Sequence, residues 1–207
     1  SPANFVATNP DVLKLASETQ GESLRAGFQN MLTDMRKGGL TITDETAFEI
    51  GKNVATSEGA VIFENELFQL IQYAPLTQEV ASRPLLIVPP CINKYYILDL
   101  QPDNSFVGHA VAQGHTVFLV SWRNVGPEQG GLTWDDYLEQ GVMQAIDVAL
   151  AISGADRANT LGFCIGGTLL ASALAGLAAR VEDKAASLTL LTPMLDFSNT
   201  GELGLMV

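Results

Sequence analysis

The sequence has few cysteines, little charge and no basic run. Its 207 residues include only two cysteines, Cys91 and Cys164. This number argues against a disulfide framework and favours the reducing cytosol. Basic residues number 11 against 23 acidic ones, for a net charge of −12. The lack of a basic face argues against binding to nucleic acid or anionic membranes. Residues 1–4 lead into polar sequence, so we expect no signal peptide.

Apolar sequence, in contrast, is plentiful. Hydrophobic residues make up 47% of the chain and charged residues 16%, which indicates a sizeable core rather than disorder. One uncharged stretch, residues 158–179, is long enough to span a bilayer and contains a G-x-x-x-G motif. However, the adjacent glycines Gly166 and Gly167 would interrupt a single long helix. We therefore favour a buried strand, a glycine turn and a buried helix over a membrane span.

The hydrophobic pattern changes near residue 60, where we place a domain boundary. Residues 1–59 predict a helical N-terminal segment, with one helix from Pro10 to Gly38 and a short one at residues 44–52. Residues 60–207 alternate short apolar runs with helical patterns, which is typical of a parallel sheet covered on both faces. We expect strands at residues 67–73, 85–88, 116–120, 160–163 and 187–191, and helices at residues 97–113, 134–152 and 165–179.

The most informative motif is G-F-C-I-G-G at residues 162–167, on a predicted strand-to-helix junction. It matches the nucleophile elbow of α/β hydrolases, with cysteine in place of serine. Glycines let strand and helix approach closely, and a helix N-terminus favours negative charge on the sulfur. We predict that Cys164 is a nucleophile and that the Ile165 N–H stabilises an oxyanion. The alternative is an inert, buried cysteine.

A second motif, P-P-C-I-N-K-Y-Y at residues 89–96, directly follows a predicted buried strand. In this fold the loop after an early strand supplies the second oxyanion donor. We assign that role to the N–H of Ile92, with Asn93 as a supporting side chain that holds a water or a hydroxyl. Cys91 is expected to pack rather than to react. The alternative is an ordinary loop punctuated by proline.

Substrate-binding residues are expected at the same edge of the sheet, where ligands bind in open α/β folds. Lys94 and Arg123 are the local basic groups that could meet an anionic ligand, and Tyr95 and Trp122 adjoin them in sequence. We predict that all four contact substrate, and we expect no metal. For Arg123, a surface salt bridge is an equally good interpretation.

The general base is missing from its usual place. In this fold an acid and then a histidine follow the nucleophile along the chain. Both histidines, His109 and His115, precede Cys164, and Asp196 is the only well-placed acid after it. A structural role at a strand end suits Asp196 better, because the acid of a triad usually comes later. We therefore expect this chain to be part of a longer protein.

Several segments of the sequence resemble the bacterial polyhydroxyalkanoate synthases, in particular those of class I. The resemblance rests on residues 89–100, 114–124, 133–137 and 162–168, and extends to residues 1–5, 53–55 and 63–66. It implies a partial α/β-hydrolase fold behind a helical N-terminal segment. It also implies a Cys-Asp-His triad, of which only the nucleophile maps onto this sequence, at Cys164. The acid and the histidine would lie beyond a lid that begins near Asp196.

The resemblance also implies an activity, which is acyl transfer from short-chain (R)-3-hydroxyacyl-CoA, chiefly 3-hydroxybutyryl-CoA, into a polyester with release of CoA. Coenzyme A enters as part of the substrate, and no cofactor is implied. The implied partners are a second copy in a homodimer and the surface of cytoplasmic storage granules. Cysteine suits this chemistry, because thioester exchange is nearly thermoneutral and the following attack by a hydroxyl is downhill.

Two other functions fit the same residues. A cysteine hydrolase or thioesterase would pass the acyl group to water, so free acid in place of polymer would identify it. A non-catalytic module for granule binding or dimerisation would explain the missing base. In such a module, a thiol-directed acyl analogue would leave Cys164 unmodified.

Overall fold

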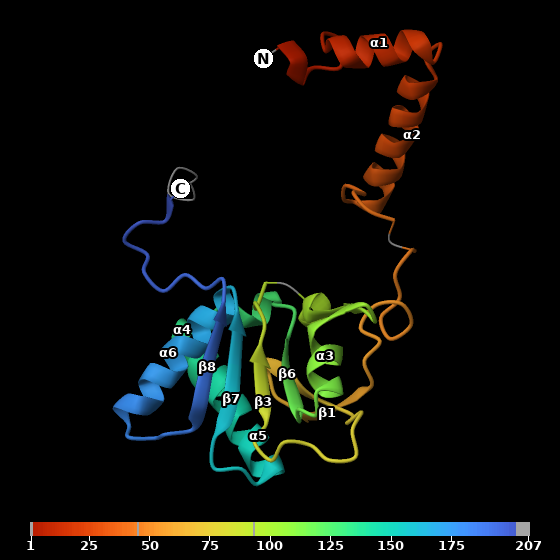
Figure 1. The fold of residues 1–207 in the computed structure, drawn as a ribbon. Coiled ribbons are helices and arrows are strands. Elements are labelled where there is room, and N and C mark those ends of the chain that lie inside the picture. Colours follow the sequence, from red (N-terminus) through yellow and green to blue (C-terminus); the bar gives the residue numbers. More distant parts are fainter. Residues whose placement is uncertain (1, 45, 93, 202–207) are drawn as a thin grey trace. The chain divides into compact units, whose positions relative to one another are not determined.

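A computed structural model describes residues 2–44, 46–92 and 94–201 of the chain (Figure 1). Its internal contacts divide the chain into two units, Ser1–Phe48 and Glu49–Val207. The sequence placed a boundary at residue 60, next to the start of the first strand at Gly59. The stretch before that strand joins the larger unit, because the Ala55 N–H donates to the Asp99 carbonyl at 2.9 Å.

The smaller unit contains the helices α1 (Pro10–Glu18) and α2 (Glu22–Lys37), after a short 3-10 turn, η1 (Pro2–Asn4). As predicted, α1 begins next to Asn9, whose side chain accepts hydrogen bonds from two backbone N–H groups of the first turn. The single helix predicted up to Gly38 is instead broken at Gly21, whose φ of 87° is left-handed. None of the residues in α1 or α2 is buried.

The short helix predicted at residues 44–52 is wrong. The described residues of this stretch form turns, and Ile50 makes an isolated bridge to Val54. Two local features compete with helix formation. The Asp44 carboxylate accepts a hydrogen bond from the Thr46 N–H at 2.9 Å, and Gly51 has a left-handed φ of 82°.

The larger unit is built on a six-stranded sheet of order β1-β2-β6-β3-β7-β8. As predicted, β6, β3, β7 and β8 are parallel, and they stand side by side in Figure 1. At the other edge, β1 and β2 form an antiparallel hairpin, so the sheet is mixed rather than wholly parallel. The strands are β1 (Gly59–Glu64), β2 (Phe68–Tyr73), β3 (Leu85–Val88), β6 (Val117–Trp122), β7 (Ala158–Phe163) and β8 (Ala185–Leu191).

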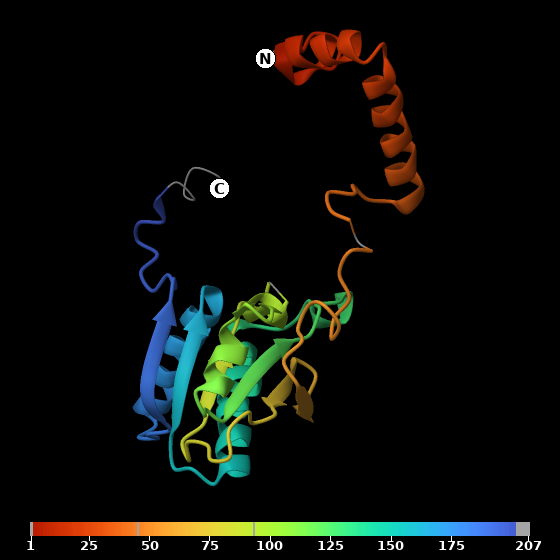
Figure 2. The same ribbon diagram turned by 45° about the vertical axis from the view of Figure 1, so that its right-hand side comes forward.

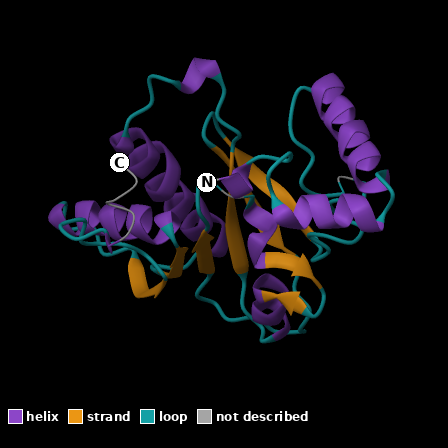
Figure 3. Ribbon diagram, turned by 90° about the horizontal axis from the view of Figure 1, so that it is seen from above, coloured by secondary structure: helices purple, strands orange, loops and turns teal. Residues whose placement is uncertain are grey.

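Helices cover both faces of this sheet (Figures 2 and 3). The alternation along β6 supplies both cores, with Phe118 on one face and Leu119 on the other. One face packs against α3 (Phe106–Ala112), and the other against α5 (Gln144–Ser153), α6 (Ile165–Ala179) and a π-helical segment, η4 (Tyr137–Met143). Short elements complete the chain: η2 (Tyr95–Leu98), β4 (Asp99–Gln101), β5 (Asn104–Ser105), η3 (Pro127–Gln129) and α4 (Trp134–Asp136).

Two helix predictions in this unit had different outcomes. The helix predicted at residues 97–113 is reduced to α3, because the hairpin of β4 and β5 interrupts it. The uncharged stretch at residues 158–179 divides, as predicted, into β7, a turn at Cys164 and α6. Across the described part of the chain, none of the helices is long and apolar enough to cross a membrane.

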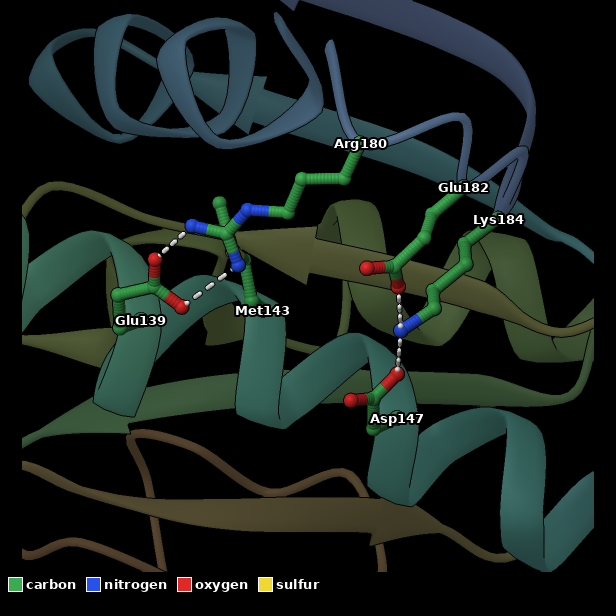
Figure 4. A network of polar contacts seen from close by, with 6 residues as sticks. All are labelled: Glu139, Met143, Asp147, Arg180, Glu182 and Lys184. Atoms are coloured by element: carbon green, nitrogen blue, oxygen red, sulfur yellow. Dashed lines mark hydrogen bonds and ion pairs between the residues drawn. The ribbon is translucent and has the colours of Figure 1, made fainter. Parts of the chain in front are cut away.

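Charged side chains tie the far end of α6 to the neighbouring helices (Figure 4). Arg180 pairs with Glu139 of η4 and holds the pKa of that carboxyl below its usual range. Lys184 contacts Asp147 of α5 at 2.7 Å and Glu182 at 2.6 Å. Such partly exposed pairs each contribute little stability. The first pair joins the C-terminal end of α6 to η4, and the second joins the turn after α6 to α5.

A buried carboxylate links the start of the larger unit to the segment after η2. Asp99 is 1% exposed and accepts hydrogen bonds from the Ser57 hydroxyl at 2.7 Å and the Ser105 hydroxyl at 2.6 Å. The Ser57 N–H adds a longer bond at 3.3 Å. Because Asp99 directly follows η2, these bonds also anchor one end of the segment that begins with the P-P-C-I motif.

We expect Asp99→Asn to lower the free energy of unfolding by roughly 1–3 kcal/mol. The amide would replace one buried acceptor with a donor that faces Ser57 or Ser105. The control is Asp103→Asn, an exposed position in the same hairpin, where the change should stay within about 0.5 kcal/mol. Urea unfolding of the complete protein measures both. Equal midpoints for the two variants would contradict this prediction.

Candidate active site

Cys164 occupies the turn between β7 and α6, with φ 53° and ψ −128°. A left-handed φ is strained for a residue with a Cβ, by about 1–3 kcal/mol. Hydrogen bonds hold the turn in this state. The Cys164 N–H donates to the Leu191 carbonyl of β8 at 2.8 Å, and the Cys164 carbonyl accepts from the Gly167 N–H at 2.9 Å. The cysteine itself is exposed. The strand, turn and helix predicted from the motif are therefore present.

The glycines of the motif lie where strand, helix and loop nearly touch. A Cβ added to Gly162 would lie 2.4 Å from the Cα of Gly167, and one on Gly166 would lie 2.3 Å from the Val88 carbonyl oxygen. Real Cβ atoms do not approach backbone so closely, and this explains why these positions carry glycine. The close approach predicted from the sequence is therefore present in the structure.

Two backbone N–H groups near the elbow are available to a ligand. Among the described residues, neither the Ile165 N–H nor the Ile92 N–H has a hydrogen-bond partner. The loop that carries Ile92 passes close to the start of α6. This is shown by the space at Gly166, where an added Cβ would lie 2.5 Å from the Pro89 carbonyl oxygen. Asn93, the predicted supporting side chain, lies outside the described residues.

Cys91 packs against the core cluster on the α6 side of the sheet and is half-buried. Burial raises the pKa of the Cys91 thiol, and the nearby Cys164 acts in the same direction. A buried thiol with a raised pKa is a poor nucleophile. These observations agree with the packing role expected for Cys91.

The predicted substrate-binding residues have protein partners at this edge of the sheet. Lys94 donates to the side chain of Asn124, which joins the loops after β3 and β6. Arg123 lies 3.6 Å from Glu128 in an exposed ion pair, the alternative considered for it. Tyr95 is half-buried, and burial raises the pKa of its hydroxyl.

Trp122, the fourth predicted substrate contact, is also engaged within the protein. Its indole N–H donates to the Pro89 carbonyl at 2.9 Å. Its ring lies beside Phe68 and Tyr137, with centroid distances of 6.1 Å and 5.6 Å. This donor is therefore occupied by the loop after β3. Sequence reasoning missed the contact, which joins residues far apart in the chain.

Comparison with known families identifies the group to which this chain belongs. The model "Poly-beta-hydroxybutyrate polymerase (PhaC) N-terminus" matches residues 1–110, more than half of the chain. The chain belongs to the PhaC polymerase family. The model "alpha/beta hydrolase fold" matches residues 84–206, which include the elbow and the loop after β3.

Named relatives agree with the PhaC assignment. The poly(3-hydroxyalkanoate) polymerase subunit PhaC of Cupriavidus necator is 62% identical over 207 residues, which are 100% of this chain and 35% of that protein. The polymerase of Methylorubrum extorquens is 44% identical, over 98% of this chain and 34% of that protein. This PhaC chain thus spans about a third of the length of these curated relatives.

Solved structures support the fold alone. A fungal esterase from Rhizomucor miehei aligns with a TM-score of 0.50 and 17% identity, over 77% of this chain and 51% of that one. The structure of EstE5 aligns with a TM-score of 0.53 and 17% identity, over 76% of this chain and 50% of that one. The PhaC chain therefore contains part of an α/β-hydrolase fold.

The histidines of this PhaC chain lie away from the elbow. His115 precedes β6, whereas Cys164 follows β7, and β3 pairs in parallel with both strands. The two residues thus lie beyond opposite ends of the parallel strands, about one strand length, or roughly 17–20 Å, apart. His109 is exposed on α3, on the face opposite to α6.

Asp196 has a local partner. Its carboxylate accepts a hydrogen bond from the Ser198 N–H at 2.9 Å, and this contact lowers the pKa of Asp196. This turn after β8 agrees with the structural role that the sequence favoured. Within the described residues, the PhaC chain therefore holds Cys164, the predicted nucleophile, in an elbow beside the Ile165 N–H, and the loop that carries Ile92 passes close to the start of α6. Both histidines lie away from this elbow.

Proposed function

We propose that the complete protein polymerises (R)-3-hydroxyacyl-CoA through an acyl thioester on Cys164. The observation that carries this proposal is the exposed Cys164, held in a strained elbow beside the unpaired Ile165 N–H, in a chain of the PhaC family. A strained, fixed nucleophile is typical of covalent catalysis. Short-chain substrates, 3-hydroxybutyryl-CoA first among them, are the proposed class, as the resemblance implies.

The first half-reaction loads the enzyme. The Cys164 thiolate attacks the carbonyl carbon of the acyl-CoA, and the resulting oxyanion accepts hydrogen bonds from the N–H groups of Ile165 and Ile92. The bond between this carbon and the CoA sulfur then breaks. CoA leaves as a thiol with the proton that the base removed from Cys164. One thioester has replaced another.

The second half-reaction extends the polyester. The 3-hydroxyl of another acyl unit attacks the Cys164 thioester, an ester C–O bond forms, and the C–S bond to Cys164 breaks. The hydroxyl proton passes to the general base and the thiolate is restored. Lys94, Tyr95 and Arg123 are proposed to contact the substrate at the mouth of the site. Asn93 is proposed to support the loop that carries Ile92.

The base is proposed to come from a histidine after the elbow in the complete protein, oriented by an aspartate. Neither His109 nor His115 lies near Cys164, and Asp196 is engaged in its own turn. Homodimerisation and association with cytoplasmic polyester granules are proposed on the resemblance alone. Thioesterase activity remains the second candidate, since its elbow would have the same geometry with water as the acceptor.

The 207 residues alone are expected to form no polymer from 3-hydroxybutyryl-CoA, although Cys164 should be acylated slowly. Loss of base assistance should lower CoA release by about 10²–10⁴-fold relative to the complete protein. Acid quenching followed by peptide mass spectrometry detects acyl-Cys164, and extraction separates polymer from free acid. Adding the remaining segment back should restore polymer formation.

Each alternative predicts a distinct result in this assay. Free acid from the complete protein would favour the thioesterase. Failure of a thiol-directed acyl analogue to label Cys164 would favour the non-catalytic module. Polymer formation by the 207 residues at the rate of the complete protein would place the base within them, and His115 and Asp196 would then have to be reconsidered.

A further inference from the structure

The position of Trp122 follows from the register of two central strands. In the parallel pair of β3 and β6, Ile87 lies opposite Leu119. β3 ends at Val88, whereas β6 continues to Trp122. The end of β6 therefore runs alongside the loop that follows β3. From there the indole N–H donates to the Pro89 carbonyl oxygen at 2.9 Å.

The indole ring is held in a closely fitted space. Phe68 meets it edge-on, and Tyr137 lies against it in a tilted arrangement. The π-helical segment η4 passes over it at Gly141, where an added Cβ would lie 2.9 Å from the Cη2 and Cζ3 atoms of Trp122. Irregular π turns of this kind are frequent at functional sites. The direction of the indole N–H is therefore fixed by two neighbouring elements, β2 and η4.

The oxyanion loop, residues 89–92, needs such an external anchor. Pro89 and Pro90 have no N–H, so neither can donate a backbone hydrogen bond to a neighbouring strand. The Pro89 carbonyl lies against the start of α6 at Gly166. The backbone runs from this carbonyl through Pro90 and Cys91 to Ile92. The orientation of the Pro89 peptide therefore affects the position of the Ile92 N–H.

We propose that Trp122 is a positioning residue of the oxyanion hole. Through the Pro89 carbonyl it holds the oxyanion loop, and with it the Ile92 N–H, against the elbow of Cys164. This inference rests on the proposed function, since an oxyanion forms only if Cys164 attacks an acyl group. It replaces the direct contact with substrate that the sequence predicted for Trp122.

The test removes the indole N–H and keeps the ring. In the complete protein, Trp122 is replaced by benzothienylalanine, in which sulfur takes the place of the N–H, and in a second variant by phenylalanine. The same replacements at Trp134 are the controls, because Trp134 is 44% exposed and its side chain makes no hydrogen bond within the described residues. CoA release from 3-hydroxybutyryl-CoA gives kcat and KM, and thermal unfolding reports folding.

We expect kcat to fall by about 10-fold to 100-fold in the sulfur analogue at position 122, because small displacements of catalytic donors have effects of this size. KM and the unfolding temperature should change little, and the Trp134 variants should match the unmodified protein. The phenylalanine variant should also lose kcat, together with some stability from the smaller ring.

An unchanged kcat would overturn the inference. So would a raised KM at unchanged kcat, which would indicate direct substrate binding, or an equal loss in the Trp134 variants. If the sulfur analogue unfolds, a purely structural role is indicated and the inference fails. The proposed function has its own readout, which is acylation of Cys164 in the unmodified protein. Absence of this acylation refutes the function, whereas acylation with an unaffected variant refutes the role of Trp122 alone.

Discussion

Replacing Cys164 with alanine in the complete protein is expected to lower the rate of polymer formation by about 10⁴-fold or more. The substitution removes one sulfur atom, the only atom of this residue that can carry the acyl chain. It leaves the backbone bonds of the elbow in place, because the Cys164 N–H and carbonyl still bond to Leu191 and Gly167.

The fold should survive this change. Cys164 is exposed, so its side chain contributes little to the core. Alanine also has a Cβ and keeps the strain of the positive φ, whereas glycine would relieve it. We therefore expect Cys164→Gly to be more stable than Cys164→Ala by about 1 kcal/mol, and both to be inactive. CoA release and urea unfolding measure the two effects separately.

Cys91→Ala is the matched control, since Cys91 is the other cysteine of the chain and packs against the core. It should keep most of the activity, with some loss of stability from the cavity. If the Cys164→Ala variant still forms polymer at a rate close to that of the unmodified protein, Cys164 is not the nucleophile. The covalent mechanism would then have to be abandoned.

Adding one methyl group at Gly166 is expected to disrupt the elbow. In Gly166→Ala the new Cβ would lie 2.3 Å from the Val88 carbonyl oxygen and 2.5 Å from the Pro89 carbonyl oxygen. Both neighbours are backbone atoms of the central strand and its loop, so α6 would have to move away. We expect a loss of about 3 kcal/mol or more, or failure to fold, and Gly166→Val should be worse still.

Gly176→Ala is the control in the same helix. There the new Cβ would meet only the flexible end of Met143, at 3.0 Å, and alanine favours helix by about 1 kcal/mol over glycine. This variant should be as stable as the unmodified protein or more so. Cys91→Ser, a change in the loop beside Gly166, should also be milder than Gly166→Val. Thermal unfolding ranks the variants, and a harmless Gly166→Ala would mean that the elbow is misinterpreted.

The elements that were predicted best from the sequence are those with a strong, local hydrophobic pattern. The apolar run of β3 and the helix after the elbow were predicted with the observed bounds. The points at which a predicted helix is interrupted were harder to predict. The turn at Gly21 and the turn after Asp44 arise from single backbone conformations and side-chain caps, which compete with the helical pattern over only a few residues. The antiparallel hairpin β1–β2 depends on strand pairing, which the alternation of elements does not specify.

The same distinction applies to the site. The elbow is encoded in six consecutive residues, so its turn and its close contacts could be predicted. The contact between Trp122 and Pro89 joins residues that are 33 positions apart, and it depends on strand register and on the course of η4. One signal was available: Gly141 stands within a predicted helix, where a glycine often marks a close approach.

Because β3 ends before β6, the backbone N–H groups that follow β3 stay outside the sheet. From the pairing of Ile87 with Leu119, Pro89 and Pro90 fall opposite Ser121 and Trp122, where β6 is still a strand. Ordinary residues there could extend the hydrogen-bond ladder between the central strands and draw Cys91 and Ile92 into it. Two consecutive residues without an N–H terminate the ladder. The proline pair therefore keeps the next backbone N–H groups out of the sheet, where they remain free to bind something else.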